Sequence, residues 1–409
     1  MQPTPKGLRL HIGIFGRRNV GKSSVLNALT RQNISIVSEV AGTTTDPVEK
    51  AMEFRPLGPV LFVDTAGIDD VGALGEERVA RTKDVIDRVD LAVLVTDAWQ
   101  TYEEELLALF RSRRVPIVAA ANKADLRIGD DLEKRLAEAG ASRVVRVCAV
   151  TGEGIEDLRE GIIACVPESF IHAQPIVADL IRPGEYVILV VPVDIAAPKG
   201  RLILPQVQTL REVLDADASA LVVKERDVAQ ALSRLHHPPA LVITDSQAFR
   251  TVSEQVPRDV PLTSFSILFT RFKGDLETAV DGARHIDGLK PGDRVLIAEA
   301  CTHHPTSEDI GRVKIPRWLE ERVKGPLDIR VSAGADFPDD LSSFSLVIHC
   351  GACVFNRRHM LSRIERCRHA GVPITNYGLA IAYLTGIFDR ALEPLMQRRE
   401  IVPSKADNA

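Results

Sequence analysis

Short apolar runs alternate with amphipathic stretches along most of the chain. Within residues 7–168, the apolar runs of strand length stand at 10–16, 60–64, 91–97, 117–122 and 144–149. Stretches with helical periodicity, such as 22–31 and 103–113, lie between them. Strands that alternate with helices are typical of a mostly parallel sheet with helices on both faces. The pattern therefore predicts an α/β domain over residues 7–168.

The same alternation returns twice on a smaller scale, after a proline-containing stretch at 169–184 that reads as a linker. Residues 185–265 carry expected strands at 186–191, 220–224 and 240–244 and expected helices at 206–214 and 227–235. Residues 266–395 carry expected strands at 294–299, 328–331, 346–349 and 373–375 and expected helices at 276–287, 316–323, 357–369 and 379–384. We therefore expect two smaller α/β domains with mostly parallel sheets, and a tail at 396–409.

The composition limits the classes of function. Hydrophobic residues make up 45% and charged residues 26% of the 409 residues, which excludes a disordered or collagenous chain. Six cysteines are too few for a disulfide framework, and the first residues lack a signal-peptide pattern, so the expected location is cytoplasmic. No apolar run approaches the roughly 20 residues of a membrane helix. A net charge of −5 with 5% aromatic residues disfavours nucleic acid as a partner.

A phosphate-binding motif stands between the first expected strand and the first expected helix. The run Gly16-Arg17-Arg18-Asn19-Val20-Gly21-Lys22-Ser23 has the P-loop spacing in the context that this motif requires. Its glycines let backbone N–H groups point at phosphates. Lys22 can reach the β- and γ-phosphates, and the Ser23 hydroxyl can complete Mg²⁺ coordination. The expected phosphate-binding residues are Gly16, Asn19, Val20, Gly21, Lys22, Ser23 and Ser24.

Two further motifs follow expected strands and complete a guanine nucleotide site. Asp64-Thr65-Ala66-Gly67 places a carboxylate near Mg²⁺ and a glycine N–H near the γ-phosphate. In Asn122-Lys123-Ala124-Asp125, Asp125 can accept the N1–H and N2 amino protons of guanine. Adenine has no donor at either position, and a buried unpaired carboxylate would reject ATP. The first domain is therefore expected to be a P-loop GTPase that binds GTP, GDP and Mg²⁺.

This combination of motifs resembles the translation-factor-related GTPases. The resemblance implies that Thr44, in Gly42-Thr43-Thr44-Thr45-Asp46, contacts the γ-phosphate and Mg²⁺ as part of the first switch. Cys148-Ala149 occupies the place of the Ser-Ala that lines the guanine in that family. The residues expected to take part in hydrolysis are thus Lys22, Thr44, Asp64 and Gly67.

Two positions bear on the rate of hydrolysis. Ile68 stands where Ras-like proteins carry the glutamine that orients water, so intrinsic hydrolysis is expected to be slow. Asn19 stands where potassium-activated relatives have an asparagine that helps to hold K⁺. The alternative is that Asn19 only caps the loop.

Two cysteine–histidine groups follow strands of the last domain. Cys301-Thr302-His303-His304 follows the run 294–299, and His349-Cys350-Gly351-Ala352-Cys353 ends the run 346–349. In an open α/β sheet, ligands bind at the carboxyl ends of the strands. Thiolates favour zinc or iron–sulfur clusters over hard cations. A closed Cys₃His zinc site, a [4Fe–4S] cluster with one open iron, and a site without metal all stay possible on the residues alone.

The whole chain resembles the HydF family, the [FeFe]-hydrogenase maturation GTPases. The resemblance implies that Cys301, Cys350 and Cys353 hold a [4Fe–4S] cluster, with His303 and His349 as its fourth ligand or as neighbours of the ligands. It further implies a homodimer formed through residues 185–265. Members of the family receive a di-iron precursor made with two radical-SAM maturases and deliver it to apo-[FeFe]-hydrogenase.

Two rival functions stay open at this point. The first domain alone is equally compatible with an RNA-directed GTPase of ribosome assembly or tRNA modification, although no KH or OB module accompanies it. The cysteine groups are also compatible with a structural zinc domain that serves as an interaction module.

Overall fold

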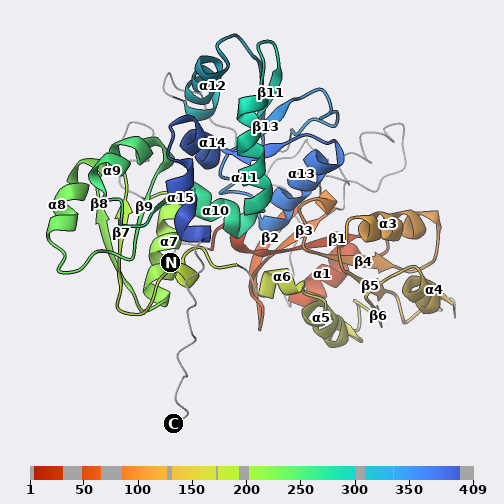
Figure 1. Cartoon of the computed structure of the whole chain (residues 1–409). Helices are drawn as coiled ribbons and strands as arrows, with labels where there is room; N and C mark the ends of the chain where they lie inside the picture. The colour runs from red at the N-terminus through yellow and green to blue at the C-terminus, as the bar shows by residue number, and fades with distance from the viewer. Residues whose placement is uncertain are drawn as a thin grey trace, which may run out of the picture. The chain divides into compact units, whose positions relative to one another are not determined.

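The computed structural model describes residues 4–30, 48–65, 85–126, 131–171, 174–192, 202–300, 309–334 and 336–396. The chain divides into two compact units, Met1–Ala173 and Gln174–Ala409, coloured red to yellow and yellow-green to blue in Figure 1. None of the described helices has the length and apolarity to cross a membrane.

The first unit contains one sheet with the strand order β2-β3-β1-β4-β5-β6. Its strands are β1 (Leu10–Phe15), β2 (Val48–Phe54), β3 (Gly58–Asp64), β4 (Leu91–Thr96), β5 (Ile117–Ala121) and β6 (Arg143–Arg146). Only the β2–β3 pair is antiparallel among the pairs that the structure describes in this sheet. Strands β1, β4 and β5 are buried along their whole length, which is the pattern of a parallel sheet covered on both faces.

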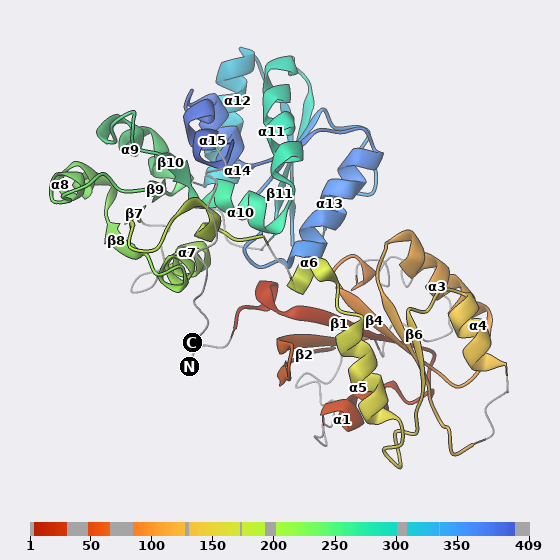
Figure 2. The same cartoon turned by 60° about the horizontal axis from the view of Figure 1, so that its bottom comes forward.

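Helices cover both faces of this sheet (Figure 2). They are α1 (Lys22–Thr30), α3 (Thr101–Ser112), α4 (Leu132–Glu138), α5 (Ile155–Ala164) and the short α6 (Glu168–Ile171). One core cluster joins the sheet to α1 and α5, and a second joins the opposite face to α3 and α4. The predicted α/β class is confirmed for this unit.

The second unit contains two four-stranded sheets in which every described pair is parallel, with the orders β10-β9-β7-β8 and β12-β11-β13-β14. The strands of the first are β7 (Tyr186–Val190), β8 (Ser219–Val223), β9 (Leu241–Thr244) and β10 (Leu262–Ser264). Those of the second are β11 (Arg294–Glu299), β12 (Asp328–Ala333), β13 (Leu346–His349) and β14 (Ile374–Asn376). The expected mostly parallel sheets are therefore present.

The helices of the second unit tie the two sheets together. They are α7 (Leu204–Asp215), α8 (Val228–Ser233), α9 (Phe249–Gln255), α10 (Phe265–Lys273), α11 (Leu276–Arg284), α12 (Ile315–Val323), α13 (Arg357–His369), α14 (Tyr377–Leu384) and α15 (Phe388–Met396). Helices α14 and α15 follow the last strand, yet Leu379 and Ala391 pack into the core of the β7–β10 sheet. The domain boundaries placed at 169–184, 265 and 395 stay predictions.

Several elements differ from the sequence prediction. The expected strand at 144–149 ends at Arg146, and the expected helix at 227–235 is a 3₁₀ turn followed by the shorter α8. The expected helix at 276–287 ends at Arg284 and continues as a 3₁₀ turn. Strands β2 and β10 and helices α9, α10 and α15 are absent from the prediction.

Candidate functional site

The P-loop connects β1 to α1, and its glycines are required by the local backbone. Gly16 and Gly21 have φ values of +145° and +93°, which L side chains rarely adopt. A Cβ atom on Gly16 would lie 2.1 Å from the Val95 carbonyl oxygen, and one on Gly21 would lie 2.4 Å from Asn122 Nδ2. The loop therefore forms a cradle in which only glycine fits at these two positions.

The expected phosphate-binding side chains take different positions around this cradle. Lys22 is buried, and its Nζ donates hydrogen bonds to the backbone oxygens of Gly16 and Arg17. Ser23 is half-buried and Ser24 is exposed. The Val20 side chain is buried in the core, so any contact of Val20 with phosphate would use its backbone. Asn19 is exposed and has a φ of +62°.

Asp64, the expected magnesium ligand, lies at the end of β3. It is paired in register with Ile14 of β1 and is 2% exposed. The next residue, Thr65, donates from its hydroxyl to the Ile14 carbonyl oxygen at 2.7 Å. The predicted residues Thr44 and Gly67 lie outside the described residues.

The expected guanine-binding residues lie at the ends of β5 and β6. Asn122 Nδ2 donates to the Val20 carbonyl oxygen at 2.8 Å, and Ala149 N donates to Asn122 Oδ1 at 3.2 Å. Cys148 Sγ donates to Asp125 Oδ1 at 3.2 Å, while Asp125 itself is exposed. Asn122 therefore joins the P-loop to the segment that follows β6, and the guanine-binding role of Asp125 stays a prediction.

An ion-pair network beside the P-loop was not anticipated from the sequence. Arg17 donates from Nη2 to Asp97 at 2.9 Å and from Nε to the fully buried Glu103 at 2.8 Å. Lys123 Nζ donates to the same Asp97 at 2.6 Å. Burial acts to raise the pKa of Asp97, but Lys123 and Arg17 together outweigh it and hold that pKa below its usual value. The second P-loop residue is thus connected to the guanine-binding motif.

The HCxxC motif of the second unit, residues 349–353, begins at the end of a strand that neighbours the strand preceding Cys301. Strands β11 and β13 are neighbours, with Ala298 paired to His349. Ala300 N donates a hydrogen bond to Cys350 Sγ at 3.1 Å. Cys350 therefore lies beside the residue that precedes Cys301 in the sequence. Cys301 and His303 themselves lie outside the described residues, and Cys353 is half-buried.

His349 is fully buried, and both of its ring nitrogens are in contact with protein groups. Nδ1 donates to the Cys350 carbonyl oxygen at 2.8 Å, and Nε2 accepts from Arg363 Nη1 at 2.9 Å. Arg363 is itself buried, with its guanidinium 4.6 Å from the ring centres of Phe337 and Phe355. Burial, assisted by Arg363, lowers the pKa of His349 to about 3, so the imidazole is neutral. In this geometry His349 orients the cysteine loop through Cys350.

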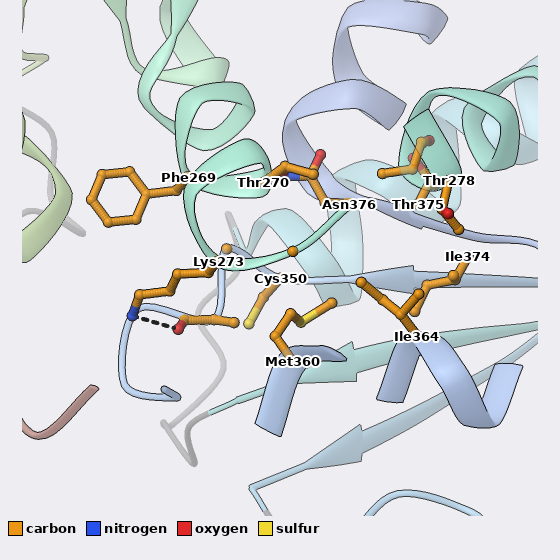
Figure 3. A pocket seen from close by; sticks show the side chains of 14 residues that line it. Phe269, Thr270, Lys273, Thr278, Cys350, Met360, Ile364, Ile374, Thr375 and Asn376 are labelled. Carbon is orange, nitrogen blue, oxygen red and sulfur yellow. Dashed lines mark hydrogen bonds between the residues drawn. The ribbon is translucent and has the colours of Figure 1, made fainter. Parts of the chain in front are cut away.

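A pocket with few polar groups adjoins Cys350 (Figure 3). Lys273 of α10, Met360 and Ile364 of α13, and Asn376 of β14 line it together with Cys350. Burial lowers the pKa of Lys273 to about 8, and the thiols of Cys353 and Cys350 act in the opposite direction. Within the described ranges, no group of three or more His, Cys, Asp or Glu side chains could hold a metal ion.

Family models match three successive parts of the chain. Residues 11–123 match the 50S ribosome-binding GTPase model. Residues 176–274 match the hydrogen maturase F dimerization domain, and residues 277–394 match the hydrogen maturase F tetramerization domain. The two hydrogen maturase F models together cover more than half of the chain. The chain belongs to the hydrogen maturase F family.

Individual relatives of this hydrogen maturase F chain match its GTPase part. The tRNA modification GTPase MnmE of Aquifex aeolicus is 40% identical over 154 residues, which are 37% of this chain and 33% of that protein. GTPase Der of Sulfurimonas denitrificans is 39% identical over 135 residues, 32% of this chain and 27% of that protein. The chain spans about a third of the length of these curated relatives.

Solved structures give a weaker likeness. The G domain of the T. maritima FeoB iron transporter is 24% identical, with a TM-score of 0.29, and covers 39% of this chain and 99% of that one. The family matches and the site geometry agree on a GTPase domain in the first unit, which the sequence predicted. They also agree with the predicted membership of the HydF family.

Proposed function

We propose that this chain is a GTP-hydrolysing scaffold of [FeFe]-hydrogenase maturation. It holds a [4Fe–4S] cluster in its second unit and delivers a di-iron precursor to apo-[FeFe]-hydrogenase in the cytoplasm. The observation that carries this proposal is the hydrogen bond from Ala300 N to Cys350 Sγ, because it brings the HCxxC motif beside the residue that precedes Cys301 in the sequence. The match to both hydrogen maturase F domain models supports a role in hydrogenase maturation.

The GTPase part of the proposal rests on the fit between the cradle and a nucleotide. A Cβ atom at Gly16 or Gly21 would clash with Val95 or Asn122, so glycine at both positions lets the loop take the backbone shape that a phosphate cradle needs. Lys22 would bind the β- and γ-phosphates, and Ser23, Thr44 and Asp64 would hold Mg²⁺, which neutralises charge as the phosphoryl group transfers. Asn19 would help to bind K⁺.

In this proposal, Asp125 is the residue that selects guanine. Cys148 holds Asp125 Oδ1 from one side, and Lys123 is fixed by Asp97. An exposed carboxylate held in this way can accept two hydrogen bonds from guanine, one from N1–H and one from the N2 amino group. Because Ile68 offers no group to orient water, we expect slow hydrolysis, with GTP acting as a switch for partner binding.

The donor set of the second unit fits an iron–sulfur cluster. Cys350 Sγ already accepts a backbone N–H, as thiolates bound to iron commonly do, and Lys273 places a positive charge near both thiols of the loop. Cys301, Cys350 and Cys353 would be the ligands. When bound, the cluster would supply an iron with an exchangeable site to which a precursor can attach.

We assign His303 and His349 different roles at the proposed cluster. The contacts of His349 with Cys350 and Arg363 favour a role beside the ligands over a role as fourth ligand. His303 keeps the position of a fourth-ligand candidate. We further propose a homodimer formed through the second unit, with two radical-SAM maturases and apo-hydrogenase as partners.

Metal analysis under anaerobic conditions tests the cluster. We expect about four irons and four sulfides per chain and, after dithionite reduction, an EPR signal of a reduced cubane. Cys350→Ser and Cys301→Ser should lose that signal, whereas Cys367→Ser should keep it, because Cys367 is buried in the hydrophobic core and belongs to neither cysteine motif. One tightly held zinc per chain, with no iron uptake on reconstitution, would overturn the cluster and favour the structural zinc domain.

An RNA-directed GTPase is the second candidate function. Its support is the match of the first unit to relatives named as tRNA modification GTPases. That match ends before the second unit, which matches hydrogen maturase F models instead. Binding of labelled tRNA by the full chain, at physiological salt and with GTP present, would favour this candidate over the maturation scaffold.

A further inference from the structure

Lys273 is a buried lysine at the end of α10, and every hydrogen bond that its ammonium group makes within the described residues goes to the cysteine loop, residues 350–355. It is 2% exposed. Its Nζ donates to the carbonyl oxygens of Phe355 at 2.7 Å, Cys353 at 2.9 Å and Ala352 at 3.2 Å. Figure 3 shows the Lys273 side chain reaching toward this loop, with a dashed line for one of these hydrogen bonds. Three carbonyl acceptors require three hydrogens, which the ammonium has and the neutral amine lacks.

A second cation, Arg357, joins the end of α10 to the segment after the cysteine loop by hydrogen bonds that are donated the other way, toward α10. Arg357, in the first turn of α13, donates from Nη1 to the carbonyl oxygens of Phe272 at 2.9 Å and Gly274 at 3.1 Å. The end of α10 therefore donates to the cysteine loop, and the segment after the loop donates back to the end of α10. The loop between β13 and α13 is held from both sides.

Charge is the unusual feature of this arrangement. In the part of the chain that the structure describes, no aspartate or glutamate pairs with Lys273. A buried charge is costly unless an opposite charge or strong hydrogen bonds offset it. Among the described residues, the ionisable side chains that favour the charged form of Lys273 are the thiols of Cys353 and Cys350. An anionic thiolate pair, or a thiolate-bound metal–sulfide group, is the partner that this cation lacks.

We propose that Lys273 is a positioning residue for the Cys350–Cys353 loop. Its three hydrogen bonds hold the loop in shape before metal arrives, and its charge offsets the negative charge of the thiolates and of the cluster that they bind. The second half of this inference rests on the proposed cluster. The first half concerns the metal-free protein alone.

Hydrogen exchange on the metal-free full chain tests the first half. In Lys273→Met, which keeps the length of the side chain but has no donor, we expect amides 351–355 to exchange about tenfold faster or more than in the wild type. Lys290→Met, at an exposed lysine of the same unit, should leave them unchanged. Equal exchange in Lys273→Met and wild type would overturn the positioning role. If Lys273→Met does not fold, Lys273→Gln, which keeps two donors, should show a smaller acceleration confined to this loop.

The cluster potential tests the second half. Lys273→Gln should still bind iron and sulfide but should have a more negative reduction potential than the wild type, because a nearby cation stabilises the reduced, more negative cluster. An unchanged potential would overturn the charge role. A wild-type chain that takes up no iron and sulfide would instead overturn the proposed function, and the exchange measurement would still decide the role of Lys273 in the loop.

Discussion

The buried carboxylate of Glu103 offers the sharpest test of how the P-loop is held. Glu103 is fully buried at the start of α3. Its Oε1 accepts from Arg17 Nε at 2.8 Å and from the Thr96 hydroxyl at 2.9 Å, and its Oε2 accepts from Gln100 N at 3.0 Å. Glu103→Gln keeps the shape but replaces one acceptor oxygen with an NH₂ group that meets a donor.

The size of the effect follows from these contacts. Removing one partner of a buried charge pair costs about 3–5 kcal/mol, and a hydrogen bond to a charged group contributes about 1.5–3 kcal/mol. Arg17 keeps its second pair with Asp97, and its side chain is 23% exposed, which reduces the loss. We therefore expect the first unit to lose about 2 kcal/mol of stability. Since Arg17 follows Gly16 in the P-loop, GDP should bind about tenfold more weakly.

Two measurements on the full chain check this prediction. Titration with a fluorescent GDP analogue gives the affinity, and hydrogen exchange of α1 and α3 gives the local stability. Glu104→Gln is the matched control, because Glu104 is the exposed neighbour on the same helix. An affinity for GDP within twofold of the wild type, together with unchanged exchange in α1, would refute the view that Glu103 holds the P-loop.

Two more predictions concern the first unit. GTP hydrolysis should be faster in KCl than in NaCl, and Asn19→Ala should remove most of that difference while GDP affinity changes little; equal rates in the two salts would leave Asn19 as a loop cap. Burial lowers the pKa of His11 from 6.5 to about 4. The unfolded chain therefore takes up a proton on His11 before the folded chain does, so stability present above pH 6.5 is lost as the pH falls toward 4, by about 2 kcal/mol at pH 5. His11→Gln should show a weaker loss of stability in urea unfolding between pH 7 and pH 5, and an equal loss in both proteins would contradict this assignment.

Elements with strong local signals are those that the sequence predicted well. Strand β13 (Leu346–His349) and helix α13 (Arg357–His369) match the prediction residue for residue. The apolar run before His349 is bounded by polar residues, and Asn356 caps α13 by accepting from His359 N. Local chemistry alone determines both boundaries.

Elements that depend on tertiary contacts were missed for identifiable reasons. Strand β2 has the sequence VEKAMEF. Its charged residues are suited to the edge of a sheet, but they interrupt the apolar run by which a strand is recognised in a sequence. Helix α10 is apolar on more than one side, because Ile267 packs into one core cluster and Phe265 and Leu268 pack into another. A helix buried on two sides lacks the single apolar stripe by which periodicity is detected.

The P-loop and the cysteine loop together show which positioning residues a sequence can and cannot reveal. In each, a buried lysine donates to the backbone carbonyls of the loop that carries the binding residues. Lys22 does so to Gly16 and Arg17, six and five residues away, so the whole arrangement falls within one motif that a sequence displays. Lys273 does so across 79 to 82 residues. Its role follows from the packing of α10 against the cysteine loop, and no spacing in the sequence marks it. Residues that position a site from a distance are therefore the part of its chemistry that only the fold can reveal.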